Sequence, residues 1–176
     1  MSHYRRVYQA GGCYFFTVNL MHRRSNDLLV QHVDKLRDAV VYVKRKWPFR
    51  IHGWVVLPDH YHCLIQLPEN DSNYSLRVRM IKTRFSAALP NSESRSLTRQ
   101  KRGERGIWQR RFWEHLIRDD RDYRLHLDYV HVNPVRHGLV KNVEDWPYST
   151  FHKYASLGIY PYDWAGTEEV KALEIE

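Results

Sequence analysis

The sequence contains few cysteines, no long apolar run and no internal repeat. Cys13 and Cys63 are the two cysteines among 176 residues, too few for a disulfide framework or a cysteine-based zinc cluster. No stretch approaches the roughly 18 apolar residues that a membrane-spanning helix requires, and the mean hydropathy is −0.66. The start of the chain lacks the apolar core of a secretory signal. We therefore expect a protein of the reducing cytoplasm without a membrane partner.

The chain has an excess of basic residues and many aromatic ones. It carries 28 Lys and Arg against 20 Asp and Glu, a formal net charge of +8, and its isoelectric point is about 9.6. Such a charge indicates a polyanionic partner, with a solubility surface as the simpler alternative. Twelve tyrosines and six tryptophans favour nucleic acid, because aromatic rings stack on unpaired bases while basic groups follow the phosphates.

Apolar patterning predicts a mixed α+β domain. We predict strands at 13–21, 51–57, 61–67 and within 107–117, and helices at 33–46, 75–89 and 121–132. Pro58 to His60 would form a hairpin turn, and Asp119 and Asp120 can cap the last helix. This βαββαβ order is that of the ferredoxin-like motif, an antiparallel sheet covered by helices on one face. The other face would then be free to hold a site.

The length suggests one domain. We assign residues 1–158 to it, with a basic N-terminal arm at 1–12 and a mobile basic loop at 90–106, which is rich in Ser, Arg and Gly. Residues 159–176 would form an irregular C-terminal tail. Its aromatic segment around Trp164 could fold over the site and restrain it.

His60-Tyr61-His62 places two imidazoles at positions i and i+2. On a strand such side chains point to the same face, about 7 Å apart between their Cα atoms, which suits two ligands of one metal ion. The chain has 11 histidines, so such a pair also arises by chance. Two partly exposed histidines at a strand edge are therefore the structural alternative.

Tyr129 and Asn133 lie four residues apart, at the end of a predicted helix. This spacing places both side chains on one helical face. Alternatively, Asn133 caps the helix and Tyr129 is a core aromatic residue.

Together the two features form a coherent site for phosphoryl chemistry. Two neutral imidazoles and an amide oxygen would hold a divalent cation, which withdraws negative charge from a phosphate as the phosphorus is attacked. The Tyr129 hydroxyl could be the nucleophile, losing its proton with the help of the metal or of water, since the ordinary pKa of a phenol is about 10. The resulting phosphotyrosine bond would conserve the energy of the phosphodiester.

Several separated motifs make the chain similar to a known family. His60-Tyr61-His62 after WVVLPD, the later DYVHVNPVRHG, and the flanking RFWEH and WPYSTFH resemble the REP-associated tyrosine transposases, a branch of the single-tyrosine HUH transposases. The resemblance covers residues 4–166. It implies a ferredoxin-like HUH domain with an additional helix that carries the tyrosine. The middle HUH residue is usually a bulky hydrophobic one, so Tyr61 is a mild departure and should pack on the opposite face of its strand.

The resemblance also implies a reaction and its residues. His60, His62 and Asn133 would bind Mg²⁺ or Mn²⁺, and Tyr129 would be the nucleophile. The expected activity is that of a single-stranded DNA endonuclease and strand transferase, which acts beside REP hairpins through a 5′-phosphotyrosine intermediate. We expect a nucleoid-associated bacterial monomer.

A DNA-recognition surface is implied as well. The N-terminal segment is expected to read a short 5′ sequence at the foot of a REP or BIME-type hairpin, and Tyr4, Arg5 and Arg6 are the matching positions. Other basic residues could line a phosphate track, namely Lys82, Arg84, those from Arg99 to Arg105, Arg110 and Arg111. A basic tail and solvated surface charges are the alternatives for these two groups.

Two other functions remain open. A ferredoxin-like sheet with exposed aromatic residues can bind hairpin DNA or RNA without catalysis. A zinc hydrolase would need a carboxylate or a third histidine beside His60 and His62. Asp59 and His131 are the candidates, although His131 should face away from Tyr129 on a helix.

Overall fold

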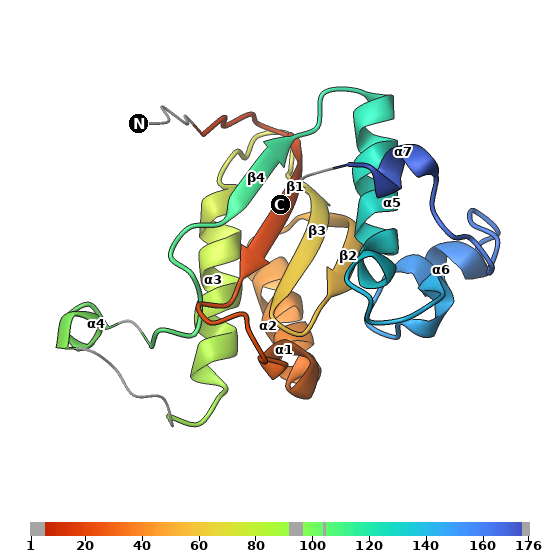
Figure 1. The fold of residues 1–176 in the computed structure, drawn as a ribbon. Helices are drawn as coiled ribbons and strands as arrows, with labels where there is room; N and C mark the ends of the chain where they lie inside the picture. Colours follow the sequence, from red (N-terminus) through yellow and green to blue (C-terminus); the bar gives the residue numbers. More distant parts are fainter. Residues whose placement is uncertain (1–5, 92–96, 104, 174–176) are drawn as a thin grey trace.

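A four-stranded antiparallel sheet organises the chain, and the computed structural model describes residues 6–91, 97–103 and 105–173 of it. The strands are β1 (Cys13–Asn19), β2 (Arg50–Val56), β3 (His60–Gln66) and β4 (Trp113–Leu116). They lie in the order β2-β3-β1-β4 (Figure 1), and every neighbouring pair is antiparallel. With the helices between them, they follow the βαββαβ order that the sequence predicts, and the expected α+β class is confirmed.

Helices α2 (Val33–Lys46) and α3 (Tyr74–Ala87) pack on one face of the sheet and against each other. Helix α2 buries Val33, Leu36 and Val43, which recur at helical spacing. Tyr61 of β3 points into this core, is fully buried and stacks on Trp54 with ring centroids 4.9 Å apart. The expectation that Tyr61 packs opposite to the two histidines is therefore confirmed.

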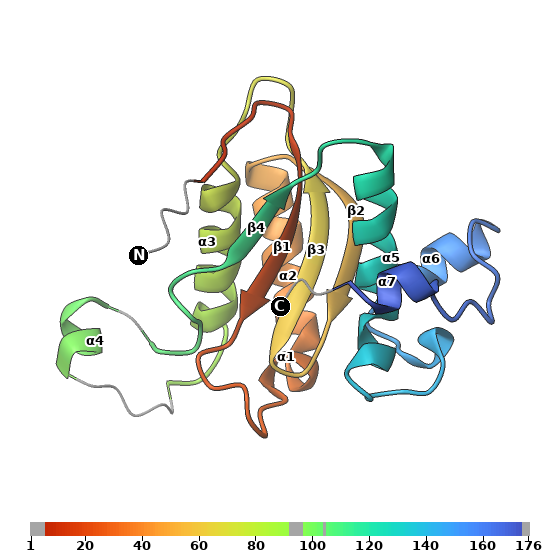
Figure 2. The same cartoon turned by 45° about the horizontal axis from the view of Figure 1, so that its top comes forward.

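The second face of the sheet is covered by α5 (Asp120–Arg136), so the expectation of a free face is wrong. Figure 2 shows α5 beside β2, on the side away from α2 and α3. Leu127 and Val130 of α5 form a second core with Phe15, Val55 and Leu64 of the strands. Helix α5 crosses the sheet because it presents these apolar side chains toward an equally apolar surface. Any site on this face must lie between the sheet and α5.

Helix α5 begins as predicted but ends later. The Asp119 side chain accepts a hydrogen bond from the Asp122 backbone N–H, 2.8 Å away, which is the expected cap. The helix then continues through Pro134 to Arg136 instead of ending near 132. Pro134 lies in the last turn, where it removes one backbone hydrogen bond, and the buried packing of Val130 to Pro134 holds the helix beyond that point.

Several short helices lie where the sequence patterns predict no helix: α1 (Leu28–Gln31), α4 (Leu97–Lys101), η1 (Val143–Asp145), α6 (Phe151–Ser156) and α7 (Glu168–Lys171). Each is too short to show a helical periodicity. Helix α4 falls within the predicted loop at 90–106, of which 92–96 and 104 lie outside the described residues. Division of the chain at residue 158 stays a prediction, although Val170 of α7 is buried in the second core. Within the described ranges, no helix has the length and apolarity needed to cross a membrane.

Gly53 sets how closely β2 approaches α5. A Cβ atom at this position would lie 2.8 Å from Leu127 Cδ1 and 3.5 Å from Val130 Cγ1. We expect Gly53→Val to lower the free energy of unfolding by about 1–3 kcal/mol through overpacking, measured by urea denaturation. Combined with Leu127→Ala, which removes the clashing group, the loss should be smaller than the sum of the two single losses. Additive losses would contradict this packing.

Candidate active site

Two buried imidazoles on β3 face α5. His60 and His62 alternate with Tyr61 and Cys63, which belong to the core on the opposite face, so the pleat directs both histidines toward α5. Their ring centroids lie 4.8 Å apart, and their exposed fractions are 1% and 0%. The structure thus brings the two predicted ligands together and buries them, and they are not partly exposed residues at a strand edge.

A hydrogen bond at Nδ1 fixes each of these rings. Asp59 Oδ1 lies 2.6 Å from His60 Nδ1. Thr17, the cross-strand partner of His62, places its Oγ1 3.0 Å from His62 Nδ1. The Nε2 atoms, both buried, are then the ring atoms that can bind a metal ion, in the arrangement typical of metal-ligating histidines.

Asp59 is kept ionised behind His60. Burial alone would raise the pKa of its carboxyl, but hydrogen bonds from His60 and Arg23 outweigh that effect and lower the pKa to about 2. Arg23 donates from Nε to Asp59 Oδ2 at 2.6 Å. An ionised carboxylate on Nδ1 increases the basicity of Nε2 and so favours a cation on the other side of the ring.

Helix α5 brings Tyr129 against His62 and carries Asn133 on the same face of the helix. The Tyr129 ring lies edge-on to His62, with centroids 5.4 Å apart, and only 1% of the side chain is exposed. Asn133 is one turn further along and is fully buried. Its amide oxygen and nitrogen have no hydrogen-bond partner among the residues that the structure describes. Because an unsatisfied buried amide costs free energy, this side chain is suited to bind an ion.

His137 also belongs to this group, although the sequence patterns did not indicate it. It is the residue that follows α5, and its ring centroid lies 5.1 Å from that of His60. One ligand atom from each of His60, His62 and His137 lies within 4.8 Å of the others. Tyr129, Asn133 and His137 follow each other at four-residue intervals. Tyr129 lies beside His62, and His137 lies beside His60. Asn133 therefore lies on the part of α5 between these two contacts.

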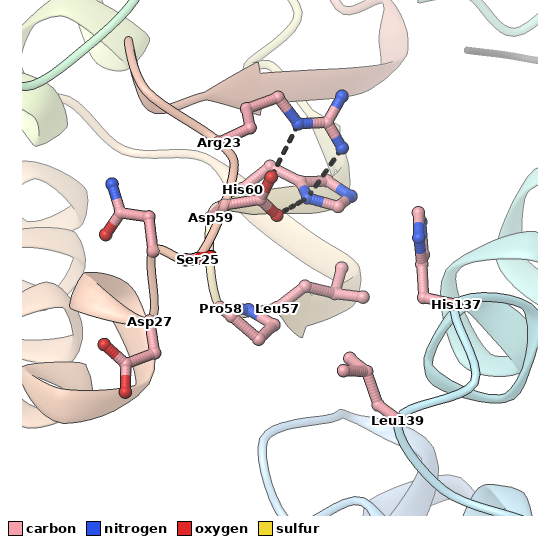
Figure 3. A pocket seen from close by; sticks show the side chains of 10 residues that line it. Arg23, Ser25, Asp27, Leu57, Pro58, Asp59, His60, His137 and Leu139 are labelled. Atoms are coloured by element: carbon pink, nitrogen blue, oxygen red, sulfur yellow. Dashed lines mark hydrogen bonds and ion pairs between the residues drawn. The ribbon is translucent and has the colours of Figure 1, made fainter.

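A pocket of about 490 Å³ opens next to His60 and His137. Figure 3 shows His60 with Asp59 and Arg23 on one side and His137 opposite them. The donor set fits a divalent cation, because it combines imidazole nitrogens whose orientation is fixed with a buried amide that lacks a partner. The pocket offers room for a phosphate beside that cation.

Comparison with known proteins agrees with this geometry. The model of the IS200-like transposase family matches residues 10–133, a range that contains both β3 histidines, Tyr129 and Asn133. A protein of Escherichia coli (strain K12) named REP-associated tyrosine transposase is 52% identical over 166 residues, which cover 94% of this chain and 92% of that protein. The chain belongs to the REP-associated tyrosine transposases.

Two further relatives support the assignment. A Haemophilus influenzae protein, provisionally given the same name, is 49% identical, and the match covers 97% of this chain and 97% of that protein. A solved structure of the REP-associated tyrosine transposase bound to a REP hairpin shares 50% identity and a TM-score of 0.81, with 95% of this chain and 93% of that chain covered. The transposase is therefore an enzyme of a DNA-acting family, and its fold is that of a solved relative.

A second hollow of about 710 Å³ gathers basic side chains from three segments of the transposase. Its basic residues are Arg6, Arg79, Lys82, Arg102, Arg105 and Arg110. All of these except Arg79 are among the residues predicted to bind DNA. Burial lowers the pKa of Lys82 to about 8, and its Nζ donates a hydrogen bond of 2.7 Å to the carbonyl oxygen of Gln109.

Among the other predicted DNA-binding residues, Arg84 and Arg111 do not line this hollow. Tyr4 and Arg5 lie outside the described residues. The Arg84 guanidinium instead stacks over the ring of Tyr42, 3.8 Å from its centroid. Arg111 is exposed and does not line the hollow.

Neither residue considered for a zinc hydrolase completes such a site. Asp59 contacts His60 at Nδ1 and so supports the ring rather than the ion. His131 points to the other side of α5, where its Nε2 lies 3.0 Å from Thr150 Oγ1 and its ring contacts Phe151. Burial lowers the pKa of His131 to about 3, which keeps it neutral.

Removing the charge behind His60 tests the metal centre. We expect Asp59→Asn to weaken Mn²⁺ binding by about tenfold, the lower end of the effect of losing an outer partner of a ligating histidine. Isothermal titration calorimetry measures this affinity. Asp34→Asn is the matched control, because Asp34 is an exposed carboxylate paired with Arg37, and it should bind Mn²⁺ as the unmodified protein does. Equal affinity of both variants would contradict the role of the Asp59 carboxylate in supporting a metal-binding His60.

Proposed function

We propose that the transposase cleaves and rejoins single-stranded DNA beside a REP-type hairpin, with Tyr129 as the nucleophile. The contact between the Tyr129 ring and His62, 5.4 Å between centroids, carries this proposal. It supports the proposal because the phenol then lies next to one of two histidines that could bind a metal ion. A tyrosine with a purely structural role would not require His60, His62 and the unsatisfied amide of Asn133 to meet on the same side of α5.

His60, His62 and Asn133 would hold Mg²⁺ or Mn²⁺, which when bound withdraws charge from the scissile phosphate. The Tyr129 oxygen forms a bond to phosphorus as the bond to the 3′ oxygen breaks. The phenol proton leaves to solvent, and the departing 3′ oxygen takes up a proton. The products are a 5′-phosphotyrosine and a free 3′-OH, and attack by a 3′-OH reverses the step without ATP.

Tyr129 must be uncovered before DNA can reach it. The Arg136 guanidinium lies 5.0 Å from the centroid of the Tyr129 ring and donates a hydrogen bond of 3.1 Å to the carbonyl oxygen of Val170 in α7. The aromatic residue Trp164 of the tail packs instead on Phe151. Displacement of Arg136, together with α7 to which it is bonded, would uncover the face of the Tyr129 ring on which Arg136 lies. The part of the tail that Arg136 contacts is α7 and not the aromatic segment around Trp164.

A single chain supplies every group that the reaction needs. Helix α5 packs on the sheet of its own chain, where Tyr129 contacts His62 and Asn133 follows one turn further along the helix. We therefore propose a monomer as the active form. Size-exclusion chromatography with light scattering tests this, with and without a hairpin.

The basic hollow is the proposed contact with the hairpin. A relative with 50% identity was solved with a REP hairpin bound, and Arg6, Lys82 and Arg110 line a concave basic surface in this chain. Such side chains neutralise phosphates and position the strand. The N-terminal arm would read a short 5′ sequence at the hairpin foot, and the protein would act on the bacterial nucleoid.

Loss of the Tyr129 hydroxyl separates cleavage from binding. Tyr129→Phe should abolish the covalent DNA adduct, because the variant lacks the oxygen that attacks phosphorus. Hairpin affinity should stay within about twofold, because the rest of the side chain is kept. A labelled hairpin with its 5′ flank, incubated with Mn²⁺ and run on a denaturing gel, reveals the adduct, and fluorescence anisotropy gives the affinity.

Tyr123→Phe is the matched control on the same helix, since the Tyr123 hydroxyl bonds to His52 Nδ1 at 3.0 Å and lies outside the site. This variant should form the adduct. An adduct that survives in Tyr129→Phe would assign the nucleophile to another residue, and no adduct in the unmodified protein would leave a binding module without catalysis.

The pKa of Lys82 predicts a pH dependence of hairpin binding. With its pKa lowered to about 8, Lys82 is charged below pH 8 and loses its charge as the pH rises to 9. Hairpin affinity should fall over that range. The slope of log K against log salt concentration should become shallower by about 0.9, which corresponds to the loss of one phosphate contact. Lys82→Arg, which stays charged, should remove this change. Identical pH profiles for the two proteins would exclude Lys82 from the interface.

A further inference from the structure

We infer that His137 is a third imidazole ligand of the metal ion in this site. The inference rests on the proposed function, because it assigns one more residue to the metal centre that His60 and His62 would form. A third imidazole would give the centre a stronger preference for transition metals than two imidazoles and an amide oxygen give.

The position of His137 is the first reason. A ligand nitrogen of His137 lies within 4.8 Å of one from His60 and one from His62, so a single ion can contact all three. The His137 ring is tilted by 70° to the His60 ring, and the His60 ring by 85° to the His62 ring. Rings at steep angles do not stack on each other, which is consistent with nitrogens that converge on one point.

The end of α5 supplies a second reason. The backbone carbonyl groups in the last turn of a helix carry a partial negative charge, which favours a cation. His137 is the residue directly after that turn, and Asn133, which lacks partners for its buried amide, belongs to the turn itself. The continuation of α5 through Pro134 is therefore what carries both side chains to the histidines of β3.

Because His137 is exposed, its role differs from that of the two buried ligands. His60 and His62 are enclosed, whereas His137 is exposed and lines the pocket that also contains Arg23 and Asp59 (Figure 3). A ligand at the rim closes the coordination sphere on the solvent side. It leaves the pocket beside it for the phosphate that the reaction needs.

The chemistry of the donor determines how the inference is tested. Mg²⁺ binds almost entirely to oxygen, and imidazole favours later transition metals, with affinity rising from Mn²⁺ to Co²⁺. If His137 binds the ion, its removal must weaken Co²⁺ more than Mn²⁺. A residue that only packs near the site would change both affinities alike.

A second group of histidines provides the matched control. His115 Nε2 lies 2.8 Å from Asp122 Oδ2, His126 Nδ1 lies 3.1 Å from Asp122 Oδ1, and the three residues also have ligand atoms within 4.8 Å of one another. The Arg118 guanidinium shares the Asp122 carboxylate at 3.0 Å. A cation would have to compete with this arginine, so we expect no ion there.

The experiment compares Co²⁺ and Mn²⁺ binding, by isothermal titration calorimetry and by the visible absorption of Co²⁺, in the full chain without DNA. His137→Ala should weaken Co²⁺ binding by at least about tenfold, which is the smallest effect expected from losing an outer partner of a ligating histidine. It should weaken Mn²⁺ binding by less. His137→Gln, which offers an oxygen ligand, should restore the affinity for Mn²⁺ more than the affinity for Co²⁺. His115→Ala should bind both ions as the unmodified protein does.

The possible failures are distinct. Unchanged Co²⁺ affinity in His137→Ala, with affinity lost in His60→Ala, would overturn the inference and leave the proposed function standing. Co²⁺ affinity lost in His115→Ala instead of His137→Ala would place the ion at the other histidine group and overturn it too. No binding of either ion to the unmodified protein would contradict the metal centre of the proposed function itself, and the inference with it.

Discussion

The packing of α5 across the sheet is the interaction on which the site depends. Leu127 and Val130 fix the helix against Phe15, Val55 and Leu64, and the absence of a side chain at Gly53 allows the close approach. Because this apolar contact holds α5 against the sheet, the polar residues of α5 lie on the side of the two β3 histidines. Burial of this kind is non-directional, so the precision of the site comes from the helical spacing of Tyr129, Asn133 and His137.

The cost of burying polar groups explains the surroundings of the site. His60 and His62 lose their contact with water, and Asp59 and Thr17 replace it at Nδ1. Asp59 in turn depends on Arg23, so the charge behind His60 is itself balanced. The buried amide of Asn133 has no such replacement, since neither its oxygen nor its nitrogen has a hydrogen-bond partner among the described residues. An ion bound at this point would satisfy it.

Local patterns were sufficient to predict the sheet and the histidine pair. The alternation of Tyr61 with His60 and His62 is a property of a single strand, and the cap at Asp119 is a property of a few neighbouring residues. The cover on the second face was not predictable in that way, because whether α5 lies on the sheet depends on the apolar surface of β1, β2 and β3 together. His137 was missed for a related reason. Pro134 indicates a helix end, and only the buried packing around it carries α5 on to Arg136.

An anomalous-scattering measurement on a crystal of the protein soaked in Mn²⁺ tests the central claim most directly. The claim predicts one strong peak in bonding distance of the Nε2 atoms of both β3 histidines, on the side that faces Asn133 and Tyr129. A peak elsewhere, or an ion held by those histidines with α5 turned so that Tyr129 faces away from it, would contradict the claim.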